Sequence, residues 1–346
     1  MTTPLATRAT SVGRRNWLLR RHLDGVDPLL RFVLARMGQA LVMLALLLPA
    51  VFLLFRLAPG DPADAVVGPD VDPAIADRLR EDYGLDEPLW RQFLIWISGV
   101  FRGDLGQSFQ YQAPVSELVG ERLLNTLALV LPACLLAVTA GIVIGAFAGA
   151  ARPSVDRAVM YGAYAIKSSP AFWVGTLAVI LFSYRLGWFP SIGTGTTGSG
   201  VTQFFSLSFL HHMILPMLIL AMFIMVEPLL TTRSGMKEVA HSDFIVLARA
   251  QGVSNRSIVL THGVRNSLLP VVSLAPLMIE ALIGGQIIME TIFSWPGMGR
   301  AIVAAVANAD YPMMQAVFLI TAGAVIVTNM CVDIAYAYLD PRVRIS

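Results

Sequence analysis

Residues 241–270 read HSDFIVLARAQGVSNRSIVLTHGVRNSLLP and form the one long polar interruption of the hydrophobic C-terminal half of the chain. The pattern predicts two short helices. Ser242 or Asp243 can cap the first, because a short polar side chain accepts hydrogen bonds from the free N–H groups of a first helical turn. Gly252 supplies the left-handed residue that ends this helix, and a second helix follows it.

The apolar side of the first helix must pack against something. A helix of about nine residues is about 13 Å long and is only marginally stable alone in water. Its apolar side chains are Phe244, Ile245, Leu247 and Ala248. Physical chemistry leaves two interpretations open: a surface helix that lies on the membrane or on the chain's own bundle, or a helix that docks on a partner protein.

The composition indicates an integral membrane protein. The chain has 346 residues, of which 56% are hydrophobic and only 14% are charged, and its mean hydropathy is +0.67. The net charge of +2 gives no indication of nucleic-acid binding. Both cysteines, Cys134 and Cys331, lie inside apolar runs, where a disulfide is not expected.

Six apolar segments are long enough to cross a bilayer, which takes about 20 helical residues. The pattern predicts an all-α fold with spans at about 32–57, 123–151, 158–184, 213–230, 268–289 and 313–338. The second and third spans are joined by a tight basic turn at 152–157. Trp188 and Trp295 stand where aromatic side chains anchor a span at the outer interface.

The distribution of Lys and Arg predicts the orientation, because cytoplasmic loops are enriched in positive charge. The basic segments are the tail at 1–30, the turn at 152–157, the loop at about 231–268 and the C-terminal Arg342 and Arg344. The loop at about 58–120 is rich in acids, and the loops at 185–212 and 290–312 contain almost no Lys or Arg. Both termini are therefore expected in the cytoplasm.

The outer loop at about 58–120 has helical patterns of its own. Residues 72–84 predict one helix, closed by Gly84. Residues 89–101 repeat apolar side chains at helical spacing and stop before Gly103. We expect both segments to be short helices packed over the outer mouth of the bundle.

The order of motifs along the chain resembles a known family. The stretch from Asp243 to Pro270 is similar to the cytoplasmic coupling loop of binding-protein-dependent ABC importer permeases, in the version found in dipeptide, oligopeptide and nickel importers. The resemblance covers about residues 30–344. The other matching motifs are LAPGDP (57–62), YGLDEP (83–88), RGDLGQS (102–108), SPAF (169–172), RLGWFP (185–190), ETIFSWPGMG (290–299), DYP (310–312) and LDPR (339–342).

This resemblance implies a type I importer permease fold at 31–346, with six transmembrane helices and a large helical extracytoplasmic loop between the first two. It also implies that the translocation path is formed with a second, related permease. Two cytoplasmic ATPases, or one two-domain ATPase, would carry ATP and Mg²⁺, and an extracytoplasmic binding protein would deliver dipeptides or oligopeptides. Nickel chelates and haem-like ligands are alternative cargoes. The implied location is the inner membrane of a bacterium.

The resemblance also assigns residues to ATPase coupling. They are Asp243, Phe244, Ile245, Leu247, Ala248, Arg249, Ala250, Gly252, His262 and Arg265. Val246 and Gln251 depart from the family pattern, which usually carries charged residues at these positions. We therefore expect apolar contact through Phe244, Ile245 and Leu247 to hold the docking.

The sequence gives little indication that the chain is an enzyme or holds a cofactor or metal. Residues 162–168 approach a Walker A motif, but Ile166 replaces its second glycine. His211 and His212 are adjacent, so on a helix they face different ways. A secondary transporter, which should show internal repeats, and a membrane-embedded enzyme, which needs several ionisable groups at one depth, are the alternative classes.

Ionisable residues inside the spans are candidates for the translocation path, since a charge near the bilayer centre costs about 2.5–3.5 kcal/mol. Glu280 lies near the middle of the fifth span. It either lines the path or is hydrogen-bonded within a subunit interface. Glu227 and Asp333 are closer to the cytoplasmic ends, where we expect them to snorkel or to pair with Arg233 or the terminal arginines.

Substituting Gly252→Val should uncouple transport from ATP hydrolysis, because a β-branched residue is poorly accepted in a left-handed cap. The check is to measure transport and ATPase stimulation at matched expression. Wild-type values for both would show that Gly252 has no capping role.

Overall fold

The computed structural model describes residues 28–56, 87–195, 201–240, 242, 245, 251–252, 271 and 286–339. Within this part every regular element is helical, so the all-α prediction is confirmed. The elements are α2 (Pro28–Arg56), α5 (Leu89–Arg102), α6 (Val115–Ala150), α7 (Pro153–Ser168), α8 (Ala171–Ala178), the π-helix η1 (Val179–Arg185), the 3-10 helix η2 (Val201–Phe205), α9 (Leu207–Ile224), α10 (Val226–Ala240), α15 (Met298–Ala307) and α16 (Tyr311–Leu339).

Four of the described helices are long and apolar enough to cross a membrane, at Leu29–Arg56, Val115–Ala150, Leu207–Ile224 and Tyr311–Tyr338. They correspond to the predicted first, second, fourth and sixth spans. The predicted fifth span, 268–289, lies mostly outside the described residues; residues 286–290 are helical.

The third predicted span differs in shape from the expectation. Residues 158–184 were expected to form one helix, but α7 and the α8–η1 helix meet at 100°. Ser169 is extended (φ −82°, ψ 136°) and Pro170 follows it, because a proline lacks an N–H group and disfavours helical geometry in the residue before it. The pair is therefore a broken segment rather than a straight one.

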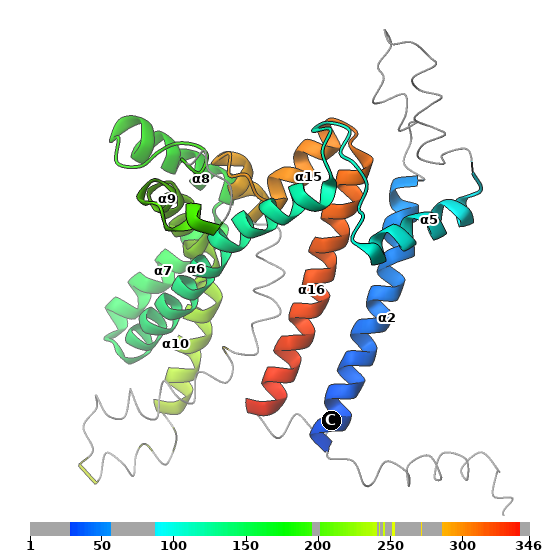
Figure 1. Cartoon of the computed structure of the whole chain (residues 1–346). Helices are drawn as coiled ribbons and strands as arrows, with labels where there is room; N and C mark the ends of the chain where they lie inside the picture. Colours follow the sequence, from blue (N-terminus) through cyan, green and yellow to red (C-terminus); the bar gives the residue numbers. More distant parts are fainter. Residues whose placement is uncertain are drawn as a thin grey trace, which may run out of the picture.

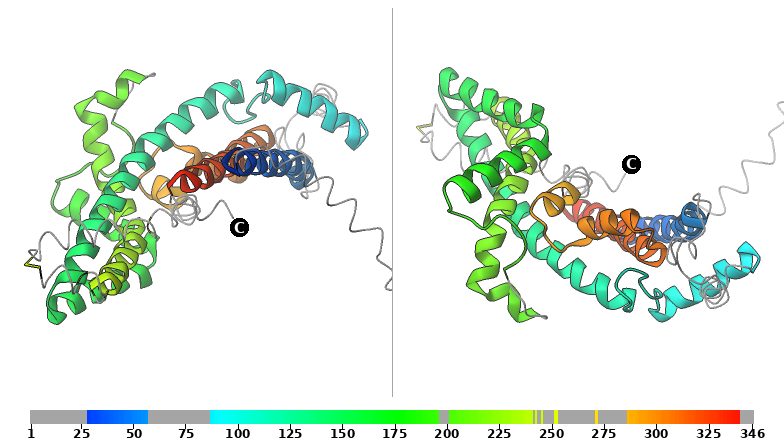
Figure 2. Two further views of the ribbon diagram at one scale, coloured as in Figure 1. Left: turned by 90° about the horizontal axis from the view of Figure 1, so that it is seen from below. Right: turned by 90° about the horizontal axis from the view of Figure 1, so that it is seen from above.

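The helices form two groups that α6 connects. In both views of Figure 2, α2 and α16 lie side by side, and an ion pair of 3.2 Å joins Arg36 to Asp333 between them. The second group contains α7 and α10. Figure 1 shows α6 starting near α15 and running diagonally down to this group. The start of α2, the end of α16, the α6–α7 turn and the end of α10 all lie toward the lower side in Figure 1.

The second predicted helix of the outer loop is present as α5. It ends where the sequence indicates, with Gly103 in the left-handed region (φ 79°) and its N–H bonded to the carbonyls of Gly99 and Val100. The ring of Phe93 packs edge-on against Phe52 of α2, with centroids 5.3 Å apart. The helix expected at 72–84 lies outside the described residues.

Asp310 attaches the outer loop to the start of α16. Its side chain is fully buried and accepts hydrogen bonds from the Ser108 hydroxyl and from the backbone N–H groups of Phe109 (3.2 Å) and Gln110 (3.3 Å). It also caps α16 through the N–H of Met313 at 3.3 Å. The RGDLGQS and DYP motifs, far apart in the sequence, are thus two halves of one contact.

Replacing Asp310 by alanine should lower the stability by about 2 kcal/mol or more, because it leaves buried donors unsatisfied and removes a helix cap. The thermal transition of the purified assembly measures this. The control is Asp104→Ala in the same loop, where an exposed carboxylate accepts one hydrogen bond from the Gly106 N–H; its cost should be about 0.5 kcal/mol or less. Equal transitions for the two variants would contradict the role given to Asp310.

Candidate functional site

The segment predicted to couple with an ATPase is reached through α10, which ends at Ala240. Helix α10 packs along α6 through a row of glycines four residues apart. A Cβ atom at Gly141 would lie 2.8 Å from the Met225 carbonyl oxygen, and one at Gly149 would lie 2.6 Å from the Met236 Cβ. At the middle glycine, Gly145, an added Cβ atom would lie 2.5 Å from the Leu229 carbonyl oxygen. The two backbones therefore lie close together along about two turns of α6. Close backbone contact of this kind drives helix association within a membrane.

A charge cluster holds α10 to the start of α7. Asp156, in the first turn of α7, accepts two hydrogen bonds from the Arg233 guanidinium, one at 2.8 Å from Nη2, and one from the Lys237 ammonium. Its side chain is only 9% exposed. The position also places a negative charge at the positive end of the α7 dipole. The fork geometry of Arg233 fixes the rotation of α10 against α7.

These contacts correct the expected pairing of the other acids. Arg233 was a predicted partner of Glu227, but it binds Asp156, and Glu227 instead pairs with Lys167 near the end of α7. Asp333 was expected to snorkel or to pair with Arg233 or the terminal arginines, but its recorded partner is Arg36 of α2. The sequence supplies the charges, but which ones meet depends on how the helices are arranged.

Most residues assigned to coupling lie outside the described part of the chain: Asp243, Phe244, Leu247, Ala248, Arg249, Ala250, His262 and Arg265. Glu280 also lies outside it. Gly252 is described and has φ +82°, in the left-handed region, with open space where a Cβ would point. Ile245 has no exposed surface. The Ser242 hydroxyl donates to the Val239 carbonyl at 2.6 Å, at the end of α10.

Toward the other end of α6, Thr126 belongs to a group of hydrogen-bonded residues that we call the outer clamp. Its members are Thr126, Gln286, Glu290, Met298 and Arg300. The fully buried Glu290 accepts from the Thr126 hydroxyl at 2.6 Å and from the Arg300 N–H at 3.0 Å. Thr126 in turn accepts from the Met298 N–H at 2.9 Å and from Gln286 at 3.4 Å. Because the buried polar groups of this network are hydrogen-bonded to one another, the network fixes one arrangement of the segments that it joins.

The turn in the ETIFSWPGMG motif fits closely around this clamp. A Cβ atom at Gly297 would collide with the Glu290 carboxylate, so the glycine is required for close approach. Trp295 is fully buried, donates its indole N–H to the Asn125 carbonyl at 2.9 Å and stacks edge-on against Phe209. The expectation that Trp295 is an interfacial anchor was therefore wrong. The side chain of Trp188 is 59% exposed, which agrees with the expectation that it anchors a span at the interface.

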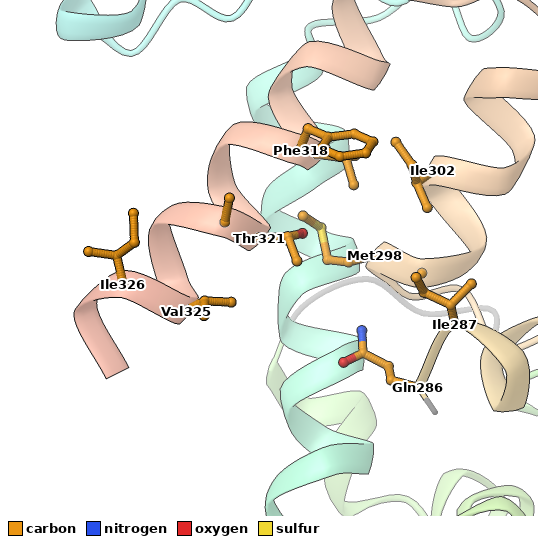
Figure 3. Close-up of a pocket in the computed structure, with 11 residues that line it drawn as sticks. Gln286, Ile287, Met298, Ile302, Phe318, Thr321, Val325 and Ile326 are labelled. Atoms are coloured by element: carbon orange, nitrogen blue, oxygen red, sulfur yellow. The ribbon is translucent and has the colours of Figure 1, made fainter. Parts of the chain in front are cut away.

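An apolar cavity of about 450 Å³ lies between the 286–302 segment and α16 (Figure 3). Its walls are almost entirely hydrocarbon, from residues such as Ile287, Met298, Ile302 and Phe318. The one amide in the wall, Gln286, already donates to Thr126 in the clamp. The cavity thus offers no free charged group among its lining residues, and it does not suit a charged cargo.

Residues 162–168 do not form a Walker A loop. They lie inside the continuous helix α7 and form no phosphate-binding loop. His211 and His212 bond to different carbonyls, those of Trp188 (2.9 Å) and Ser208 (2.8 Å). Among the described residues, no group of three or more His, Cys, Asp and Glu is placed to hold a metal ion.

Comparison with known proteins assigns the family. Residues 141–345 match the family described as "Binding-protein-dependent transport system inner membrane component", and residues 29–130 match its N-terminal counterpart, "Binding-prot-dependent transport system membrane comp, N-term". The chain belongs to this permease family.

Named relatives cover most of the permease. It is 38% identical to the oligopeptide transport system permease protein AppB of Bacillus subtilis, over 85% of this chain and 92% of the relative. It is 39% identical to a putative peptide transport system permease protein of Brucella abortus, over 90% of this chain and 98% of the relative. It is 35% identical to the glutathione transport system permease protein GsiC of Escherichia coli O6:H1, over 91% of this chain and 99% of the relative.

In the permease, α6 therefore connects two fixed contacts. At one end it carries α10 and α7, which adjoin the predicted coupling segment, and at the other it carries the outer clamp. With 36 residues, α6 is about 54 Å long. Such a helix can convey a displacement of α10 to the clamp without any chemistry of its own.

Substituting Gly145→Leu should separate α6 from α10 and reduce coupled transport about tenfold, because overpacking of this size costs about 1–3 kcal/mol. Uptake and thermal stability of the assembled complex are the measurements. Gly120→Leu is the matched control, since Gly120 lies on the same helix with open space around it. If both variants lose function equally, the α6–α10 contact is not what matters.

Proposed function

We propose that this permease is a subunit of an ATP-driven importer of dipeptides or oligopeptides. The observation that supports this most strongly is the 35–39% identity, over nearly the whole chain, to permeases whose names specify oligopeptide, peptide and glutathione transport. Glutathione is itself a tripeptide, so the named cargoes share one chemistry. The chain contributes the path and its movement, and partner ATPases supply ATP and Mg²⁺.

The proposed assembly contains a second, related permease, two ATPase subunits or one two-domain ATPase, and an extracytoplasmic substrate-binding protein. The charge pattern supports an orientation with both termini in the cytoplasm of a bacterial inner membrane, because the described helix ends next to the four basic segments lie on the same side of the molecule (Figure 1). The coupling residues, from Asp243 to Arg265, would then face the ATPases, with Phe244 and Leu247 as the apolar contacts.

The proposed mechanism is rigid-body gating. When ATP binding closes the ATPases, they displace the coupling segment and with it α10. Because Gly141, Gly145 and Gly149 hold α6 against α10, and Asp156 holds α7 against it, the three helices move together. The outer clamp transfers that movement to the 286–300 segment, which opens or closes the outer side of the path.

The test is to reconstitute the permease with its partners in proteoliposomes and to measure uptake of a labelled dipeptide and a labelled oligopeptide. Uptake is expected to require ATP, the ATPases and the binding protein. Nickel chelate and haem, offered in parallel with the cognate binding protein, should not be accumulated. Uptake of either of these instead of peptide would overturn the cargo assignment, and peptide uptake without the ATPases would indicate a secondary transporter.

A further inference from the structure

Helix α7 buries Asp156 and Ala163 and exposes a row of polar side chains beside small or apolar residues such as Val155 and Ala165. Its inner side, with Ala163 and Ile166, packs against Val226 and Leu229 of α10. Its exposed side carries polar groups at intervals of three or four residues, Arg157, Tyr161, Tyr164 and Lys167, with Ser168 next to the last. Tyr161 and Tyr164 are 73% and 54% exposed. A helix that faces lipid needs the opposite arrangement, with apolar groups outermost.

The other long helices do show that lipid-facing arrangement. The large exposed side chains of α2 and α6 include Leu41, Leu46, Leu135, Val143 and Phe147. The exposed surface of α7 differs from theirs because its large side chains, Tyr161, Tyr164 and Lys167, carry hydroxyl and charged groups. The exposed side of α7 therefore faces water or another protein rather than lipid.

The Lys167–Glu227 ion pair lies where two apolar segments are interrupted. Lys167 precedes the break at Ser169–Pro170, and Glu227 follows the end of α9 at Met225. Both side chains are about half exposed, at 54% and 45%. Charged groups and interrupted helices within a membrane-spanning region are tolerated where they line a water-filled cavity or are buried in protein.

We propose that the exposed side of α7 lines the water-filled part of the translocation path, and that Lys167 and Glu227 receive the charged ends of a zwitterionic peptide. Glu227 binds the ammonium group of the peptide and Lys167 binds its carboxylate. The ion pair between Lys167 and Glu227 is thereby replaced by two ion pairs with the peptide. This inference rests on the proposed function. Water is favoured over a protein partner because an ammonium is strongly hydrated and lysine is depleted from the centres of protein interfaces.

The first test measures water access in the whole transporter, assembled in nanodiscs. Cys134 and Cys331 are replaced by alanine, and single variants Tyr164→Cys and Leu41→Cys are treated with a charged methanethiosulfonate reagent. We expect Tyr164→Cys to react at least about tenfold faster, because the reactive thiolate forms only where water reaches it. A rate as low as that of Leu41→Cys would place this side of α7 in a dry interface and overturn the proposal.

The second test separates a ligand contact from a structural ion pair. Lys167→Glu and Glu227→Lys should each lower peptide uptake about tenfold, the effect of one charge-assisted hydrogen bond. The double exchange should stay low, because it restores the pair but accepts the peptide only with its two ends reversed relative to the rest of the path. Recovery of uptake would overturn the ligand role. Arg36→Asp with Asp333→Arg is the matched control for a structural pair, and its double exchange should restore uptake.

These outcomes are distinct from failure of the proposed function. Co-purification of the partner subunits checks that each variant assembles. A wild-type complex that takes up no peptide would overturn the importer assignment, whereas the labelling rates report on α7 whatever the cargo is. A complex that transports peptide while Tyr164→Cys stays unreactive would overturn only the present inference.

Discussion

The close contact of α6 with α10 is the interaction on which the rest of the structure depends. In a membrane, apolar side chains gain nothing by leaving lipid for one another, so helices associate through tight backbone contact and hydrogen bonds. Gly141, Gly145 and Gly149 allow that contact along the length of α10. The ion pairs of Asp156 then set the rotation of α7 on the same helix. Without the glycines, α6 would lose its direct backbone contact with α10.

Local features of the sequence were sufficient for much of the fold. The end of α5 at Gly103 and the helical character of the described apolar segments follow from short-range rules of capping and periodicity. The SPAF motif at 169–172 contains the proline that breaks the third span, but hydropathy averaged over that span does not register a break. A bend depends on what each half packs against, which the local pattern does not contain.

The site was less predictable because it is made of long-range pairs. Ser108 and Asp310, or Thr126 and Glu290, are each recognisable as polar residues near apolar runs, but nothing nearby in the sequence indicates that they meet. Trp295 shows the same limit. An aromatic residue at the end of a span is typical of an interfacial anchor, yet here its indole is fully buried against Asn125 and Phe209. Burial of this kind depends on a neighbouring turn, and the closely fitting Gly297 was the one local signal of it.

The acids of this permease are used in two opposite ways, and the difference follows from their surroundings. Glu290 and Asp310 are fully buried and bonded to backbone N–H groups, which cannot move away without breaking the turns that carry them. They therefore stabilise single arrangements of the outer segments. Glu227 is bonded instead to a flexible lysine side chain and is about half exposed, so its partner can be exchanged at little cost. A transporter needs both kinds: fixed contacts that carry a movement as a unit, and exchangeable ones where the cargo passes.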